Sequence, residues 1–241
     1  MPTISPDGNK LFVIWRDSYP IVDTCYGYWN NIYVLHRLED GTWTPPKNLG
    51  ENVNVGLGIG DFCISPDLKE IYICHYTYLS GDKLFWSFRE DTLCDTCWVL
   101  EEPFSEEILE YDGTLFGVSI SGDGLRLYPY HFAGYFINLQ RDSIGGEWYR
   151  IYDDSDYPSP GPYSGMTFTA DMTECFYNPY DPHDIHYSRK IGSEWTEGIP
   201  LGNPPNTPDL SEWFGVSISP NGNELYYFTL ARGLYFDITP I

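Results

Sequence analysis

One hairpin phrase recurs five times along this chain, and the recurrence constrains the fold more than any other feature. Each copy predicts a strand, a tight turn built from Pro, Asp, Asn or Gly, and a second strand rich in apolar and aromatic residues. A third strand segment follows in every unit, and in four units a tryptophan then opens a fourth segment. The copies begin at Ile4, Ile64, Ile120, Phe168 and Ile218, and the tryptophans are Trp43, Trp98, Trp148 and Trp195.

Short strands in groups of four, repeated at intervals of about 40–60 residues, are typical of a β-propeller. We therefore predict an all-β fold, a single five-bladed β-propeller of four-stranded antiparallel blades over residues 1–241. The blades are expected at about 1–55, 56–111, 112–160, 161–209 and 210–241. No segment has the apolar spacing of a long amphipathic helix. Because the chain stops just after a third strand segment, the last blade either has three strands or is completed beyond Ile241.

The turn sequence carries a resemblance to a known family. Residues 5–7 and 65–67 both read Ser-Pro-Asp before an apolar-aromatic strand, which resembles the TolB-type, WD-repeat-like propeller repeat over nearly the whole chain. This resemblance implies a propeller that serves as an interaction platform, and it slightly favours a periplasmic or extracellular location. Two copies depart from the pattern, because residues 169–171 read Thr-Ala-Asp and Asn221 replaces the aspartate. A sialidase Asp-box is disfavoured, since the aspartate directly precedes Gly8 without the intervening residue of that motif.

The charge balance restricts the partners that the protein can bind. The chain has 13 basic and 35 acidic residues, which gives a formal net charge of −22. Such a charge repels phosphate backbones and anionic membrane surfaces, and it favours cations, neutral polar ligands or basic partners. No stretch approaches the roughly 20 apolar residues of a membrane-spanning helix, and the N-terminal residues lack a signal-peptide pattern. We expect a monomer that binds no nucleic acid and inserts into no membrane, in a compartment that the sequence leaves open.

Ligand-binding residues are expected on the loops at one face of the ring. In a four-stranded antiparallel blade, the second-to-third loops and the blade-to-blade connections emerge on the same face, and loops on a rigid scaffold commonly carry function. Aromatic rings stack on sugars and attract cations, while carboxylates accept hydrogen bonds from hydroxyl groups. The aromatic candidates are Tyr28, Trp29, Tyr157, Tyr163 and Trp213, and the acidic candidates are Asp61, Glu110 and Glu212. The alternative is that these loops are only solvated.

Two histidines, His75 and His131, occupy the same repeat position in neighbouring units and are expected near the same face. They are candidates to bind a ligand, or a metal together with Asp61 or Glu110, and the alternative is that they are hydrogen-bonded packing residues. His186 is expected at a core position, on the opposite side of its strand from His183. No metal site or cofactor is predicted, although Asp-rich turns can hold calcium or another divalent metal weakly.

Six cysteines are too few for a disulfide scaffold in a chain of 241 residues. Cys94 and Cys97 have no second pair and no nearby histidine, so a zinc site there would be short of ligands. Structural thiols, either unpaired or locally bridged, are therefore favoured over metal or redox chemistry.

Three functions remain open at this point. The first is a non-catalytic recognition module that binds a carbohydrate or a protein segment on the loop face. The second is a saccharide-active enzyme, a glycoside hydrolase or polysaccharide lyase, with Asp61, Glu110 and Glu212 as channel-mouth carboxylates or with a metal held by histidines. The third is a structural propeller fragment of a larger protein. No carboxylate pair stands out by motif, so the first function is preferred.

Overall fold

The structure is a computed structural model. It describes residues 2–16, 30–55, 58–76, 83–110, 115–131, 135–152, 164–179, 184–202, 215–219, 222–229 and 235–240. Within these residues the strands pair into five antiparallel sheets, which we number 1 to 5 in chain order. In the same part of the chain, no helix has the length and apolar character needed to cross a membrane.

Sheets 1 and 2 each have four strands in sequential order. Sheet 1 contains β1 (Thr3–Ile4), β2 (Lys10–Arg16), β3 (Asn30–His36) and β4 (Lys47–Asn48). Sheet 2 contains β5 (Gly58–Ile64), β6 (Glu70–Tyr76), β7 (Lys83–Phe88) and β8 (Glu102–Pro103). The second and third strands pair along their whole length, whereas the fourth strand pairs over two residues in each sheet.

Sheets 3 and 4 each have five strands, and sheet 5 has three. Sheet 3 contains β9 (Leu115–Ile120), β10 (Arg126–His131), β11 (Tyr135–Phe136), β12 (Asn138–Gln140) and β13 (Tyr149–Ile151). Sheet 4 contains β14 (Ser164–Phe168), β15 (Glu174–Asn178), β16 (His186–Ile191), β17 (Glu194–Trp195) and β18 (Ile199–Pro200). Sheet 5 contains β19 (Val216–Ile218), β20 (Glu224–Thr229) and β21 (Tyr235–Pro240). The extra strands arise because the third strand of sheet 3 and the fourth strand of sheet 4 are each divided in two.

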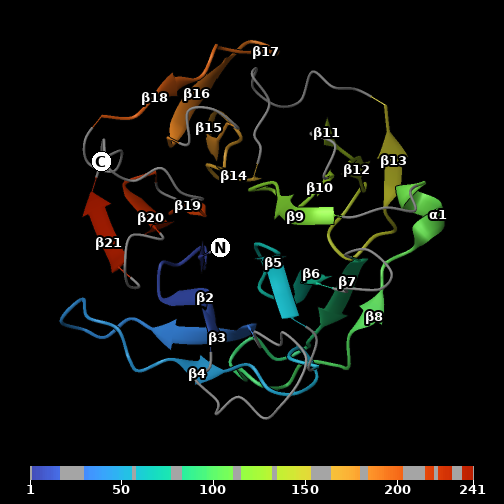
Figure 1. Cartoon of the computed structure of the whole chain (residues 1–241), viewed down its shortest axis with the longest axis vertical. Helices are drawn as coiled ribbons and strands as arrows, with labels where there is room; N and C mark the ends of the chain where they lie inside the picture. The colour runs from blue at the N-terminus through green and yellow to red at the C-terminus, as the bar shows by residue number, and fades with distance from the viewer. Residues whose placement is uncertain are drawn as a thin grey trace, which may run out of the picture.

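The sheets stand around a central axis (Figure 1). β5, β9, β14 and β19 lie nearest the centre, and β4, β8, β13, β18 and β21 lie at the outside. α1 (Glu106–Leu109), the single helix of the described residues, lies at the outer edge between sheets 2 and 3. The all-β class and the propeller arrangement are therefore confirmed. Four sheets have at least the four strands predicted for a blade, whereas sheet 5 has three.

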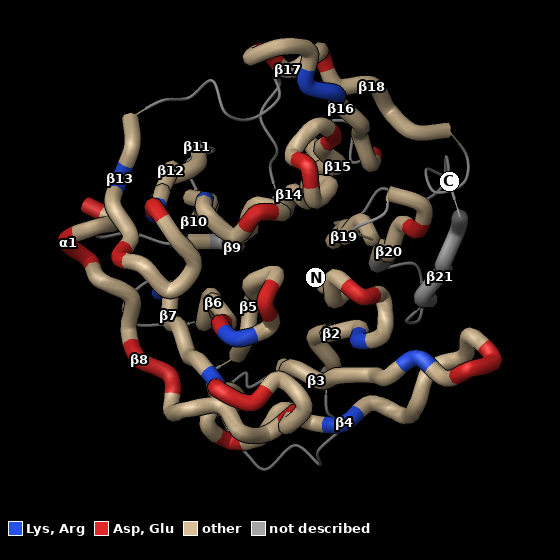
Figure 2. The backbone as a smooth tube through the Cα atoms, turned by 180° about the vertical axis from the view of Figure 1, so that it is seen from behind, with Lys and Arg blue, Asp and Glu red and all other residues tan. Residues whose placement is uncertain are grey.

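The recurrent turn explains why the phrase is repeated. In sheet 2, the Ser65 hydroxyl donates to Asp67 Oδ1 at 2.6 Å and accepts from the Glu70 backbone N–H at 2.9 Å. The hydroxyls of Ser5, Ser121 and Thr169 likewise each donate to the aspartate two residues further along the chain. One residue in each turn takes a left-handed φ, and these residues are Gly8, Leu68, Gly124, Met172 and Gly222. Glycine is favoured there because it has no Cβ. Figure 2 shows acidic residues at several of these turns near the centre of the ring.

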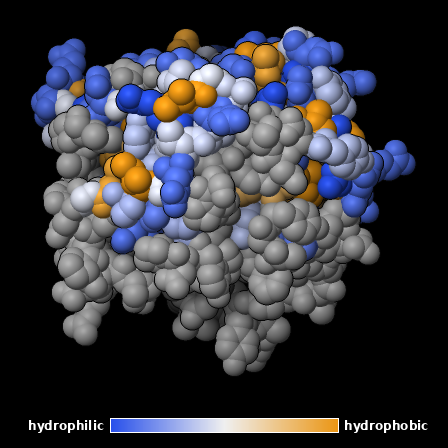
Figure 3. All heavy atoms as spheres, turned by 90° about the horizontal axis from the view of Figure 1, so that it is seen from above, coloured by the Kyte–Doolittle hydropathy of each residue, from blue (hydrophilic) through white to orange (hydrophobic). Residues whose placement is uncertain are grey.

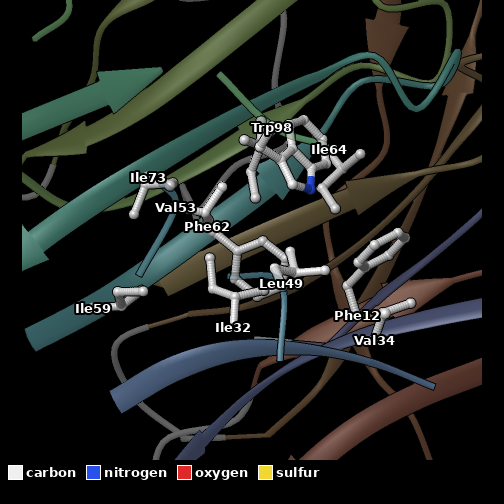
Figure 4. Close-up of a cluster of buried hydrophobic side chains, with 11 residues drawn as sticks. Phe12, Ile32, Val34, Leu49, Val53, Ile59, Phe62, Ile64, Ile73 and Trp98 are labelled. Atoms are coloured by element: carbon white, nitrogen blue, oxygen red, sulfur yellow. The ribbon is translucent and has the colours of Figure 1, made fainter. Parts of the chain in front are cut away.

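The hydrophobic core is divided among the seams between neighbouring sheets. Figure 4 shows the seam between sheets 1 and 2, where Phe12 belongs to one buried cluster with Phe62 and Trp98. At the other end of the chain, Leu11 of sheet 1 shares a buried cluster with Tyr226 of sheet 5, which closes the ring. Three further buried clusters fill the remaining seams, so each sheet is covered on both faces. The second strands of the sheets accordingly read as nearly continuous apolar runs.

The predicted tryptophans lie in these seams, each beneath a cation from the end of the preceding strand. The pairs are Arg37 with Trp43, Arg89 with Trp98, Arg141 with Trp148 and Lys190 with Trp195, at 5.8, 4.4, 4.4 and 5.5 Å from the ring centroid. A cation over an indole face is attracted by the ring quadrupole, most strongly where water is excluded. The tryptophan that opens each fourth segment is therefore a packing element of the blade seam.

Candidate functional site

The predicted ligand face lies at the end of the ring where β2, β6, β10, β15 and β20 end, and we call it the loop face. Six of the ten predicted site residues fall in segments outside the described residues: Tyr28, Trp29, Tyr157, Tyr163, Glu212 and Trp213. The structure places the other four, which are Asp61, His75, Glu110 and His131. The described residues therefore define the strand ends and the frame beneath the loop face.

Asp61 lies in the innermost strand of sheet 2 and is 4% exposed. Its Oδ2 accepts a hydrogen bond from the Val118 backbone N–H of β9 at 3.1 Å, so the side chain bridges sheets 2 and 3. The approach is close because residue 117 is a glycine, where a Cβ would meet Asp61 Oδ2 at 2.6 Å. Burial raises the pKa of the Asp61 carboxyl above its ordinary value. A carboxyl in such a setting favours the protonated form, which is the property required of a general acid.

His75 forms a buried pair with Glu101, a residue that the sequence analysis did not single out. His75 Nε2 lies 2.7 and 2.9 Å from the two carboxylate oxygens, and the side chains are 0% and 2% exposed. The Phe85 ring meets the imidazole edge-on at a centroid distance of 5.0 Å. A carboxylate that binds one ring nitrogen fixes the orientation of an imidazole. Glu101 has no counterpart in the repeat pattern, so no spacing signal in the sequence could have identified it.

His131 ends β10 and is buried, and this burial lowers the pKa of its imidazole. Strand alternation places it on the side of Leu127, in the seam between sheets 2 and 3. His75 lies on the side of Ile73, in the seam between sheets 1 and 2. The two histidines share a repeat position but are separated by sheet 2. Across the described ranges, no group of three His, Cys, Asp or Glu side chains is arranged to hold a metal ion.

Glu110 is exposed at the C-terminal end of α1, at the outer edge of the ring (Figure 1). Its carboxylate accepts a hydrogen bond from the Tyr152 hydroxyl and lies 3.7 Å from Arg150 Nη1. Asp61 lies instead in an inner strand. The structure therefore does not bring these two acidic candidates together.

His186 and the cysteines complete the predicted chemistry. His186 is buried with its ring 5.9 Å from that of Tyr177, as expected for a core position, and burial lowers its pKa. Cys94 and Cys97 form a disulfide, which confirms the locally bridged alternative for this pair. Among the described residues, Cys63, Cys74 and Cys175 form no disulfide, and all three are buried. Cys25 and His183 lie outside the described residues.

The surface of the described part carries scattered apolar side chains. Figure 3 shows one side of the ring, where orange apolar residues lie among blue hydrophilic ones. The most exposed large apolar residues are Leu93, Tyr152, Ile191, Leu100 and Ile199, which come from sheets 2, 3 and 4. Scattered exposed apolar residues of this kind are normal for a protein surface.

The radial sheets and their shared seams define the class of protein, which is a β-propeller. No protein-family model matches the chain, and no curated protein sequence matches it either. A glycosyl hydrolase from Bacteroides ovatus superposes with a TM-score of 0.57 at 8% identity, over all of this chain and 84% of that one. A periplasmic gluconolactonase from Pseudomonas aeruginosa superposes with a TM-score of 0.50 at 12% sequence identity, over all of this chain and 71% of that one. TolB from Acinetobacter baumannii superposes with a TM-score of 0.49 at 15% sequence identity, over 99% of this chain and 51% of that one. At these identities the likeness concerns the fold alone.

Proposed function

We propose that this chain is a recognition module that binds a carbohydrate or a protein segment at the loop face. We further infer that it is a monomeric TolB-type propeller in which sheet 5 serves as a fifth, three-stranded blade. The repeated turn supports the assignment of sheet 5 as a fifth copy of the blade. In each of the five copies, the backbone N–H of the first residue of the second strand donates to the hydroxyl of the residue that begins the turn. These hydroxyls belong to Ser5, Ser65, Ser121, Thr169 and Ser219.

One observation carries the proposal: the strands beneath the loop face are fixed by buried polar contacts. Asp61 joins sheets 2 and 3, and His75 is paired with Glu101. The Asn30 amide at the start of β3 donates to the Ile59 carbonyl of sheet 2 at 3.1 Å. Strand ends that are fixed in this way hold the ends of the loops in place. A ligand that binds these loops then costs less conformational entropy, because the strand ends do not have to be ordered when it binds.

The sequence of the connecting segments gives the class of ligand. Segments 17–29, 153–163 and 203–214 contain all five aromatic candidates together with Glu212. Rings beside carboxylates suit a sugar, whose C–H face stacks on an aromatic side chain while its hydroxyls donate to oxygen. The net charge of −22 adds a preference for neutral or basic ligands over anionic ones.

The proposal is tested by a glycan array combined with a thermal-shift screen against sugars and peptides. Trp29→Ala and Trp213→Ala are each expected to weaken binding at least tenfold, because a stacked ring is lost. Tyr149→Ala is the matched control, since Tyr149 is exposed on β13, at the outside of the ring, and its hydroxyl donates to Asp142. Equal affinity in all three variants would place the ligand elsewhere and overturn the proposal.

An enzyme acting on saccharides is the second candidate, and the His75–Glu101 pair favours it. A histidine oriented by a carboxylate is a common general base. Against this, Asp61 bonds toward sheet 3 whereas His75 faces sheet 1, so the two do not meet at one substrate atom. Polysaccharide turnover that is lost in His75→Gln, with unchanged glycan binding and melting temperature, would establish the enzyme. Absence of turnover in the unmodified protein would exclude it for the substrates tested.

A further inference from the structure

The Cys94–Cys97 disulfide closes a short loop of sheet 2 that lies against sheet 1. Cys97 is exposed and Cys94 is half-buried, so the bridge is open to solvent on one side. Asp95, between the two cysteines, is only 5% exposed. The covalent constraint therefore encloses a buried carboxylate.

Asp95 makes three side-chain contacts with sheet 1, two of them with lysines. Its Oδ1 accepts from Lys10 Nζ at 3.1 Å, and its Oδ2 accepts from His36 Nε2 at 3.0 Å and Lys47 Nζ at 3.1 Å. Lys10 Nζ also donates to the Thr92 carbonyl of the same loop at 2.8 Å. The loop therefore forms a charged link between sheets 1 and 2.

The disulfide loop is also tied to the core of its own sheet. Arg89 Nη1 donates to the Cys94 carbonyl at 3.0 Å, and the guanidinium lies 4.4 Å from the centroid of the Trp98 ring. Trp98 is buried in the apolar cluster shared by sheets 1 and 2. The loop backbone is thus connected to both the charged and the apolar parts of this seam.

We propose that Cys94–Cys97 is a thiol–disulfide exchange site for a dithiol reductant, and that its reduction releases the Asp95 link between sheets 1 and 2. This inference is independent of the ligand proposed for the loop face. Buried structural disulfides resist exchange because a thiolate cannot reach a sulfur, whereas Cys97 is accessible. The short Cys-x-x-Cys ring holds the backbone of residues 94–97 in the conformation that aims Asp95 at sheet 1.

The exchange is balanced in two steps. A thiolate of the dithiol attacks Cys97 Sγ, a mixed disulfide forms, the Cys94–Cys97 bond breaks, and Cys94 leaves as a thiolate that takes up a proton. The second thiol of the reductant then attacks the reductant sulfur of the mixed disulfide and displaces Cys97, which is also protonated. The protein gains two electrons and two protons, and the dithiol becomes a disulfide.

Hydrogen exchange measured by mass spectrometry on the full chain tests the proposal. The protein is treated with dithiothreitol or, in parallel, with a reduced oxidoreductase that has a Cys-x-x-Cys site, and thiol formation is followed by alkylation. Reduction is expected to speed amide exchange at least tenfold in residues 92–98 and in the sheet 1 segments around Lys10 and Lys47. Response to dithiothreitol alone would identify a small-molecule source, and response to both would admit a protein reductant.

Asp95→Asn separates the link from the bridge. In this variant exchange in sheet 1 should already be fast, and reduction should add nothing there. Asp91→Asn is the control, because Asp91 is exposed in the same loop and its side chain accepts from the Leu93 backbone N–H of that loop, on the side of sheet 2. It should behave as the unmodified protein does. A bridge that resists both reductants, reduction without change in sheet 1, or sheet 1 exchange that is already as fast in Asp91→Asn as in Asp95→Asn would each overturn the proposal.

Discussion

Arg37 in the first sheet and Glu224 in the last form a two-pronged ion pair, with Nη1–Oε2 and Nη2–Oε1 distances of 3.0 and 2.9 Å. The same guanidinium lies over the Trp43 ring, which meets Tyr226 of sheet 5 edge-on. Nearer the axis, the Ile4 backbone N–H donates to Ser217 Oγ at 3.3 Å. The ring is thus closed by side-chain contacts between the two ends of the chain. The junction between sheets 2 and 3 has a corresponding ion pair, in which Arg141 Nη1 lies 2.9 and 2.7 Å from the two carboxylate oxygens of Glu70.

Glu224→Gln is expected to destabilise the protein by about 1–2 kcal/mol, because a charge-assisted hydrogen bond becomes neutral while both groups stay partly buried. The hydrogen bond from Arg37 lowers the pKa of Glu224. A carboxyl group whose pKa is lowered by folding stabilises the folded protein at any pH above its ordinary, unfolded pKa. This stabilisation is lost as the pH falls through the lower pKa of the folded protein. Urea unfolding of the variant and of Glu194→Gln, an exposed control in β17, measures the effect. Equal losses in both variants would contradict a role in ring closure.

Asp95 should make stability depend on pH below the ordinary range of carboxyl titration. Burial alone would raise its pKa, but hydrogen bonds from His36, Lys10 and Lys47 outweigh it and lower the pKa to about 2 from 3.8. The corresponding contribution is at most about 2 kcal/mol, reduced by solvent around Lys47. It is fully present above pH 3.8 and is lost as the pH falls toward 2. Thermal melts of Asp95→Asn should show a smaller loss of stability between pH 3.8 and 2 than the parent shows, because other carboxylates such as Glu224 also titrate there. An unchanged slope would refute the assignment.

Ser65→Ala should show that the repeated turn contributes to stability through its hydroxyl. The substitution removes the bond to Asp67 and leaves the buried Glu70 backbone N–H without its side-chain acceptor, at an expected cost of about 1–3 kcal/mol. Ser105→Ala is the control, because Ser105 is exposed and its side chain makes no capping bond. Chemical denaturation should leave the control within about 0.5 kcal/mol of the parent. A similar small change in Ser65→Ala would count against this explanation of the phrase.

Gly117→Ala tests the close approach of sheets 2 and 3. The added methyl would lie 2.6 Å from Asp61 Oδ2, so the carboxyl or the strand has to move, at a cost of about 1–3 kcal/mol. Gly202→Ala is the matched control, since a Cβ there meets nothing within 4 Å. Melting temperatures of the two variants provide the comparison. If both variants melt together, Asp61 is not held as tightly as its bond to Val118 indicates.

The sequence predicted the turn correctly because the turn is local. Ser65 bonds to residues two and five positions away, so the choice of side chains within one short phrase is enough to define it. The same holds for the left-handed residue, which is glycine in three of the five copies and is tolerated as Leu68 and Met172 in the others. The candidate site was less predictable. Glu101 was missed because it is not repeated, and Glu110 lies at the outer edge of the ring.

By itself, the sequence determined that this protein is all-β and built from repeated antiparallel hairpins, since turn chemistry and apolar patterning act between near neighbours. Only the tertiary structure decided which charges meet. Glu70 pairs with Arg141 across 71 residues, and Arg37 pairs with Glu224 across 187. Such partners depend on which sheet stands next in the ring, and that order is fixed by packing along both faces of every sheet. The same packing separates His75 from His131, although the two occupy one position in the repeat.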